Sequence, residues 1–317
     1  MFFILLILMI IVWIDAIRKA ECLSAILNNT HFQMTIKGTW YILVNGIYFE
    51  KDEVEILPYL KLRKINKLSV FELAGLGAKG FQQWSLIEPF CYLKNNFEII
   101  SSENDSTFGY DILNRAWLLN TLLVLRKKTT INSIALLNQS WNNLKELNDV
   151  QANLCDYHIK MQKINSLSES KIEGTDIQWL KEHFENANVL AFKHEKFRYS
   201  LEVLNSWRYC VDLKSAIAII WAAIESIVDV SSEITYRLSL SIASLLHDRG
   251  EKRIEKFKEI KKLYSLRSRV VHGSNIKEID IENALVGSFK LLSELINYMI
   301  ENNKMISEND FESAIFK

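Results

Sequence analysis

The chain has 317 residues, of which 49% are apolar and 24% are charged, enough for a sizeable hydrophobic core and for one or two domains. Its 38 Lys and Arg residues equal its 38 Asp and Glu residues, so it carries no net charge. This composition excludes collagenous and wholly disordered classes, and it excludes binding of nucleic acid or membrane through bulk charge, although a local patch can still bind either.

The cysteines and histidines are scattered along the sequence. Four cysteines occur without any Cys-x-x-Cys pair, which predicts neither a thiolate zinc site nor a disulfide scaffold: Cys22, Cys91, Cys155 and Cys210. The six histidines show no usual ligand spacing either. We therefore expect reduced thiols, no metal and no other cofactor.

The first 30 residues contain a hydrophobic run, Phe2 to Ile14, that is followed by Arg18 and Lys19. The run is shorter than the about 20 residues of a spanning helix, and no basic segment precedes it, which argues against a secretory signal. Two interpretations remain: a membrane anchor over residues 2–17, or a buried helix or misassigned start codon. Both leave the main body in the cytoplasm, and an anchor would hold it at the inner face of the membrane.

Residues 31–165 predict a mixed α+β region. Over 39–49, β-branched and aromatic residues surround an Asn45-Gly46 pair, which predicts a β-hairpin. Phe97–Ile100 predicts a further short strand, and residues 110–125 have the apolar spacing of a helix. We expect this region to sense a trigger or to restrain the remainder of the chain.

The polar stretch 166–176 predicts a linker, and residues 177–303 beyond it predict a helical bundle. This part has no proline, and its helical segments lie near 177–187, 193–211, 213–230, 232–248, 252–272 and 281–302. Plausible N-caps and stops separate them at Asp212, Ser232, Gly250, Gly273 and Asp280. Residues 304–317 are expected to be a tail. The expected fold class is mainly α, a C-terminal helical bundle preceded by a mixed α+β N-terminal region.

Two charged residues fall on apolar helix faces of this bundle. Glu225 is the only charge between Ser215 and Val228. Arg267 lies on an apolar stripe of the segment 252–272, whose other members are Ile254, Phe257, Ile260, Tyr264 and Val271. Since a buried guanidinium needs an anionic partner, we expect Glu225 and Arg267 to pair between two helices. Removing one member of such a buried pair should cost about 3–5 kcal/mol.

His272 follows Arg267 by five residues and stands directly before Gly273. On an ideal helix the two side chains diverge by about 140°. They can therefore act on one ligand only if the helix turns near Val271 or if two chains of a dimer supply one each. The alternative is a helix-terminal histidine that interacts with the helix dipole, but this alternative leaves Arg267 unexplained.

The sequence Arg267-Ser268-Arg269-Val270-Val271-His272-Gly273 resembles the R-x4-6-H signature of the HEPN superfamily, in the variant of its ApeA-like branch. The segments Trp221–Glu225, Glu233–Leu238 and Ile242–Leu246 are similar to the helices before the motif in that branch, and the likeness covers about residues 190–300. The resemblance implies a HEPN-like helical bundle that forms a homodimer, in which two motifs line a shared cleft.

Active members of the superfamily are metal-independent endoribonucleases, and many serve in anti-phage defence, abortive infection or toxin-like growth arrest. The resemblance therefore implies that Arg267 and His272 form a catalytic pair acting on RNA, with tRNA among the candidate substrates. Ser268 would occupy the polar position after the arginine, and Glu225 would orient the site. Serine is usual in the ApeA-like branch, but many active relatives carry Asn, Asp or His there. A phage-derived or nucleotide trigger is expected to act through the N-terminal region.

The residue types agree with this chemistry independently of the resemblance. RNA is cleaved when its 2′-hydroxyl attacks the adjacent phosphate, a step that needs a proton acceptor, a proton donor and positive charge at the phosphate. Histidine titrates near neutral pH and suits the proton transfers. Arginine matches phosphate oxygens with a bidentate fork and stays charged.

The segment Arg249–Arg269 holds nine basic residues and three glutamates, in a chain without net charge. Such runs are usually solvated helix faces with Glu–Lys pairs, but three glutamates cannot neutralise nine cations. The excess favours a phosphate backbone near the motif, with these candidate RNA contacts: Lys261, Lys262, Tyr264 and Arg269. The alternative function is a non-catalytic HEPN module that binds RNA or a protein partner without cutting it.

Overall fold

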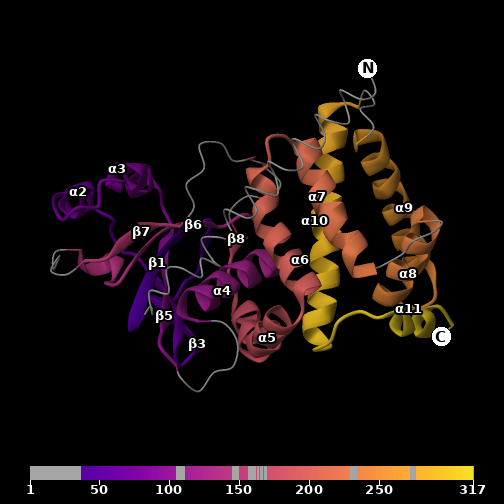
Figure 1. The fold of residues 1–317 in the computed structure, drawn as a ribbon, viewed down its shortest axis with the longest axis horizontal. Helices are drawn as coiled ribbons and strands as arrows, with labels where there is room; N and C mark the ends of the chain where they lie inside the picture. The colour runs from indigo at the N-terminus through magenta and orange to yellow at the C-terminus, as the bar shows by residue number, and fades with distance from the viewer. Residues whose placement is uncertain are drawn as a thin grey trace. The chain divides into compact units, whose positions relative to one another are not determined.

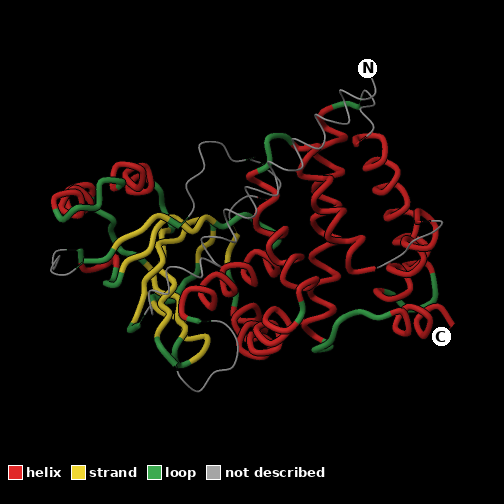
Figure 2. Tube along the Cα trace, in the orientation of Figure 1, coloured by secondary structure: helices red, strands yellow, loops and turns green. Residues whose placement is uncertain are grey.

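The structure is a computed structural model that describes residues 37–104, 111–144, 150–155, 162, 164, 167, 170–228, 234–271 and 276–316. The hydrophobic run in residues 1–30, with both of its interpretations, lies outside these ranges, as do Ser232, His272 and Gly273. Gly38–Lys317 form one compact unit, in which a sheet-containing N-terminal region is followed by helices (Figures 1 and 2). The unit is mainly α, as the sequence predicts. None of the described helices has the length and apolarity needed to cross a bilayer.

A six-stranded sheet with the order β3-β4-β5-β1-β6-β7 forms the N-terminal region, and all of its neighbouring strands are antiparallel. Its strands are β1 (Thr39–Asn45), β3 (Glu53–Leu57), β4 (Leu60–Lys64), β5 (Asn96–Ser102), β6 (Asn132–Leu137) and β7 (Ala152–Leu154). The predicted strand Phe97–Ile100 lies within β5, so this prediction is confirmed.

The hairpin predicted over residues 39–49 is wrong. After β1 the chain leaves the sheet, and β2 (Ile47–Tyr48) pairs in parallel with β8 (Ser170–Lys171). Gly46 makes this departure with φ at 121°, and a Cβ there would lie 2.5 Å from the carbonyl oxygen of Thr130. The Asn45-Gly46 pair thus marks a real bend. However, β1 is a central strand whose two sides are taken by β5 and β6, which leaves no edge for β2.

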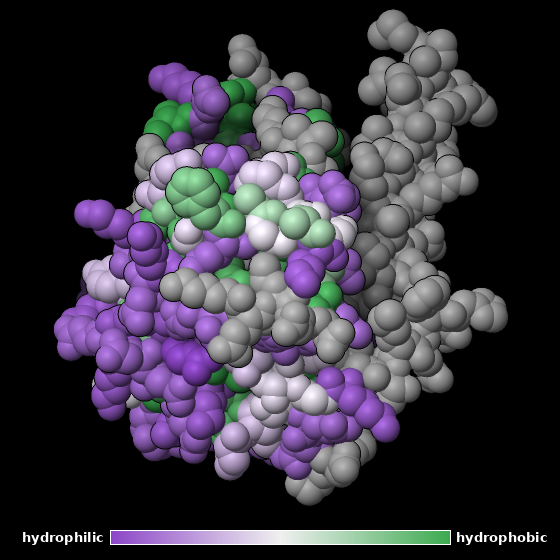
Figure 3. All heavy atoms as spheres, turned by 90° about the vertical axis from the view of Figure 1, so that its left-hand side faces the viewer, coloured by the Kyte–Doolittle hydropathy of each residue, from purple (hydrophilic) through white to green (hydrophobic). Residues whose placement is uncertain are grey.

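The two faces of the sheet pack against different layers of helix. Ile42 and Val44 face a cluster that includes α4 (Ile112–Lys127), whereas Leu43 faces a second cluster with α2 (Val70–Ala78). The second layer continues through α3 (Trp84–Ile87) and the 3₁₀ helix η1 (Glu88–Tyr92). Figure 3 faces the side of the molecule where this layer lies, and hydrophilic residues dominate the view, with a smaller hydrophobic area above them.

The C-terminal helices confirm the predicted bundle and adjust its boundaries. They are α5 (Gly174–Lys193), α6 (Glu195–Ser206), the 3₁₀ helix η4 (Trp207–Tyr209), α7 (Leu213–Val228), α8 (Ile234–Leu246), α9 (Glu251–Val271), α10 (Glu278–Glu301) and α11 (Glu308–Phe316). Asp212 caps α7, since its Oδ1 accepts a bond from the backbone N of Ser215 at 2.7 Å. Asp280 lies in the first turn of α10 and not at its N-cap. The predicted tail, residues 304–317, contains α11.

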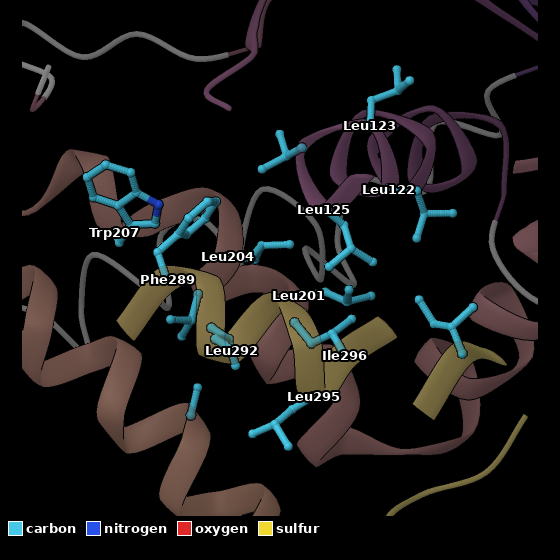
Figure 4. Packing of buried hydrophobic residues seen from close by; sticks show 14 of the residues in the cluster. Leu122, Leu123, Leu125, Leu201, Leu204, Trp207, Phe289, Leu292, Leu295 and Ile296 are labelled. Carbon is cyan, nitrogen blue, oxygen red and sulfur yellow. The ribbon is translucent and has the colours of Figure 1, made fainter. Parts of the chain in front are cut away.

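One hydrophobic core joins the sheet to the bundle. Figure 4 shows the part of it where α4, α6 and α10 meet, and the rings of Trp207 and Phe289 lie there with centroids 5.8 Å apart. The stretch 166–176 contributes β8 and the buried Ile172 to the same unit. It is therefore part of the packed fold and not a linker between two separate domains.

Candidate functional site

Helix α7 supplies the carboxylate of the site. It is apolar nearly all round, and eight of its residues are buried: Ala216, Ile217, Ile220, Trp221, Ala223, Ile224, Ile227 and Val228. Glu225 lies one turn before the end of this helix and is half-buried. The oxygen atoms of a half-buried carboxylate need hydrogen-bond donors. At this position the donors have to come from a neighbouring helix or from water.

Helix α9 supplies the guanidinium, but its inward face differs from the predicted stripe. Ile260 and Tyr264 are buried as expected, whereas Ile254 is 55% exposed and Val271 is 38% exposed. The buried face includes Lys256, Leu263 and Val270 instead. Helix α10 sets this rotation, because Leu263 packs against Gly287 and Lys256 Nζ lies 2.7 Å from Glu294 Oε2.

Arg267 and Glu225 form the predicted pair between α9 and α7. Nη2 of Arg267 lies 3.3 Å from Oε1 and 3.4 Å from Oε2 of Glu225. The pairing is confirmed, but not its full burial, since the side chains are 23% and 31% exposed. The pair therefore lies between exposed pairs, which contribute about 0–1 kcal/mol, and fully buried ones, for which loss of one member costs more. Oε1 of Glu225 and Nε of Arg267 are buried, but other parts of both side chains reach solvent, where a phosphate can bind the guanidinium.

One aromatic ring lies beneath the guanidinium, and a second ring packs against the first. Cζ of Arg267 lies 5.5 Å from the ring centroid of Tyr264, which in turn meets Trp221 edge to face at 5.2 Å. Nε1 of Trp221 donates to Oγ of Ser288 on α10 at 2.8 Å. This chain of contacts ties Arg267 to three helices. Trp221 and Ser288 were not predicted to be part of the site, although Trp221 stands four residues before Glu225 and thus on the same face of α7.

Tyr264 is buried, which contradicts its predicted contact with RNA and raises the pKa of its hydroxyl. The residue is only 8% exposed, so its ring is not open for contact with RNA. Burial raises the pKa of its hydroxyl above the usual value, and the nearby Glu225 carboxylate raises it further, while Arg267 acts in the opposite direction. The phenol therefore stays protonated at neutral pH and serves as a neutral support for the charged pair.

The remaining predicted residues fall into two groups. Ser268 is half-buried next to Arg267, and Lys261, Lys262 and Arg269 are exposed on α9. His272 lies outside the described residues, so the structure brings together Glu225, Tyr264 and Arg267 only. No group of three His, Cys, Asp or Glu in the described part of the chain could hold a metal ion.

The pKa of Tyr264 gives a test of this geometry that needs no substrate. In Glu225→Gln the negative charge beside the phenol is lost, so the pKa of Tyr264 is expected to fall toward its usual value. In Arg267→Ala the opposing cation is lost, so the same pKa is expected to rise. Titration of tyrosine labelled with ¹³C at Cζ measures both shifts by NMR. Equal titration of Tyr264 in the wild type and both variants would contradict the arrangement.

Comparison of the chain with protein-family models, with curated proteins and with solved structures gave no match. Any assignment of function therefore depends on the residues of this site and on the motif that contains Arg267.

Proposed function

We propose that the chain is a metal-independent endoribonuclease of the HEPN type, in which Arg267 and His272 act on one phosphodiester of RNA. The observation that carries the proposal is the position of Arg267. Its guanidinium is tied to the bundle through Glu225 and Tyr264, yet the side chain stays partly exposed in the last turns of α9, five residues before His272 in the sequence. A purely structural ion pair does not require a histidine at this spacing.

The charge distribution around α9 supports an anionic substrate. From Lys258 to Val271 the helix contains a single acid, Glu259, which pairs with Lys256 at 3.1 Å. The exposed cations on this part of the helix are Lys258, Lys261, Lys262 and Arg269. Cations that are not neutralised by nearby carboxylates attract a phosphate backbone and release its counterions on binding.

The proposed reaction is attack of the ribose 2′-hydroxyl on the adjacent phosphorus. His272 takes the proton of the 2′-hydroxyl, the 2′-oxygen forms a bond to phosphorus, and the bond from phosphorus to the 5′-oxygen breaks. The departing 5′-oxygen receives a proton, which in the proposed homodimer comes from the second copy of the motif. Arg267 binds the non-bridging oxygens as charge develops on them. Glu225 orients the guanidinium, and Ser268 offers a hydroxyl beside it.

Incubation of total RNA with the purified protein in excess EDTA tests this function. We expect cleavage to continue in the chelator, because none of the proposed steps uses a metal ion. Loss of all cleavage on chelation, with recovery on addition of Mg²⁺, would contradict the mechanism.

The basic face of α9 also favours a second candidate, a non-catalytic module that binds RNA. In that case the protein retains RNA in a filter-binding assay but leaves it intact under every condition.

On the resemblance alone, we propose a role in anti-phage defence or toxin-like growth arrest for the enzyme, with a phage-derived or nucleotide trigger acting through residues 31–165.

A further inference from the structure

An aromatic side chain outside the motif is exposed on the neighbouring helix. Tyr236, in the first turn of α8, is 53% exposed. Its ring meets that of Phe257 on α9 edge to face, with centroids 5.5 Å apart and planes at 75°. Phe257 is itself half-buried against the core. The tyrosine ring is therefore braced by α9 while about half of its surface remains open to solvent.

A cation lies beside the ring that braces Tyr236. Nζ of Lys261 lies 5.9 Å from the ring centroid of Phe257, the same ring that braces Tyr236. Helix α8 contains no Asp or Glu. Lys258 and Lys262 add further exposed cations on α9. An accessible aromatic ring among cations matches the pattern of sites that bind single-stranded nucleic acid.

The helix geometry connects this ring to the motif. One side of α9 carries Phe257, Lys261 and Ser268. They are spaced by four and seven residues, so they lie within about 40° of one another around the helix axis. Lys261 precedes Ser268 by about 10 Å along the helix axis. A strand that follows this side of α9 can therefore pass Tyr236 and reach the residues beside Arg267 within a few nucleotides.

We propose that Tyr236 is a stacking site for one unpaired base, while Lys261 and its basic neighbours bind the adjacent phosphates. This inference rests on the proposed function, because it places the bound strand on the path to Arg267. The nucleotide bound at Tyr236 must then be unpaired, since a base within a duplex has both faces covered by its neighbours. Phenylalanine at position 236 preserves the stacking face, whereas alanine removes it.

The test is a binding titration with a short single-stranded DNA that carries 2-aminopurine, a base whose fluorescence is quenched on stacking. DNA lacks the 2′-hydroxyl and is not cut, so binding is measured apart from cleavage. Tyr236→Ala is expected to weaken binding by about 5- to 150-fold and to abolish the quenching, and Tyr236→Phe to preserve both. The control is Tyr92→Ala, which removes a 72% exposed tyrosine from η1 and is expected to change neither. Circular dichroism confirms that each variant is folded.

The outcomes separate this inference from the proposed function. If the wild type cleaves RNA in EDTA but Tyr236→Ala binds and quenches the oligonucleotide as the wild type does, the stacking site is wrong and the nuclease stands. If binding depends on Tyr236 but RNA is never cleaved, the nuclease is wrong and the stacking site stands. Displacement of the oligonucleotide by polyglutamate, with no dependence on Tyr236, would identify an acidic protein segment as the partner and overturn the inference.

Discussion

Replacing His272 by alanine is expected to lower the rate of RNA cleavage by about 10²- to 10⁴-fold, because the proton transfers lose their catalyst. RNA binding should change little, since the exposed cations of α9 are all retained. Single-turnover cleavage of a labelled RNA, with the protein in excess, measures the rate, and a filter-binding assay measures the affinity.

The matched control for this variant is His247→Ala, which removes a histidine that directly follows α8. Its cleavage rate is expected to equal that of the wild type. If His272→Ala also cleaves at the wild-type rate, His272 acts only on the helix dipole and the proposed mechanism fails.

Arg267→Lys tests the arginine in the same assay. It keeps the charge but loses the bidentate fork, and a decrease of about 10²- to 10³-fold in the cleavage rate is expected.

Replacing Trp221 by alanine is expected to lower the free energy of unfolding by about 3–5 kcal/mol, because it leaves a large cavity among buried residues of α7. The indole is fully buried, supports Tyr264 and bonds to Ser288. Urea denaturation followed by circular dichroism measures the change.

Two further variants serve as comparisons for the stability of Trp221→Ala. Ser288→Ala removes the hydrogen-bond partner of the indole alone, and a smaller loss of about 1–3 kcal/mol is expected because the Trp221 donor is left buried without a partner. Phe71→Ala removes an aromatic ring that is 89% exposed on α2, and its effect is expected to stay within about 0.5 kcal/mol. A Trp221→Ala variant as stable as Phe71→Ala would show that the ring does not support the site.

The ion pair was predictable from the sequence because each of its members is anomalous. Glu225 is the only charge between Ser215 and Val228 of an apolar helix, and Arg267 lies next to the inward side of another, so each of them needs a partner. The order of the C-terminal helices was predictable for a related reason, since helical periodicity is a local property of the chain.

The sequence does not predict the features that depend on distant segments of the chain. The Asn45-Gly46 bend is local, but the partners of β1 come from β5 and β6, about 50 and 90 residues later. The apolar pattern of α9 does not predict which side of the helix faces inward, because one of its inward residues is charged. Lys256 is buried where it pairs with Glu259 of its own helix and with Glu294 on a helix later in the chain. The exposure of Tyr236 likewise depends on how α8 packs against α9, which periodicity alone does not give.

The most direct test of the account is the chemical identity of the RNA ends formed in EDTA. Attack by the 2′-hydroxyl predicts fragments that carry a 2′,3′-cyclic phosphate and a free 5′-hydroxyl, which mass spectrometry of a short synthetic RNA identifies. A single 2′-deoxy substitution at the cut position should abolish cleavage there. Fragments that carry a 3′-hydroxyl and a 5′-phosphate, or RNA left intact by the wild-type protein, would contradict the action of Arg267 and His272 on one phosphodiester.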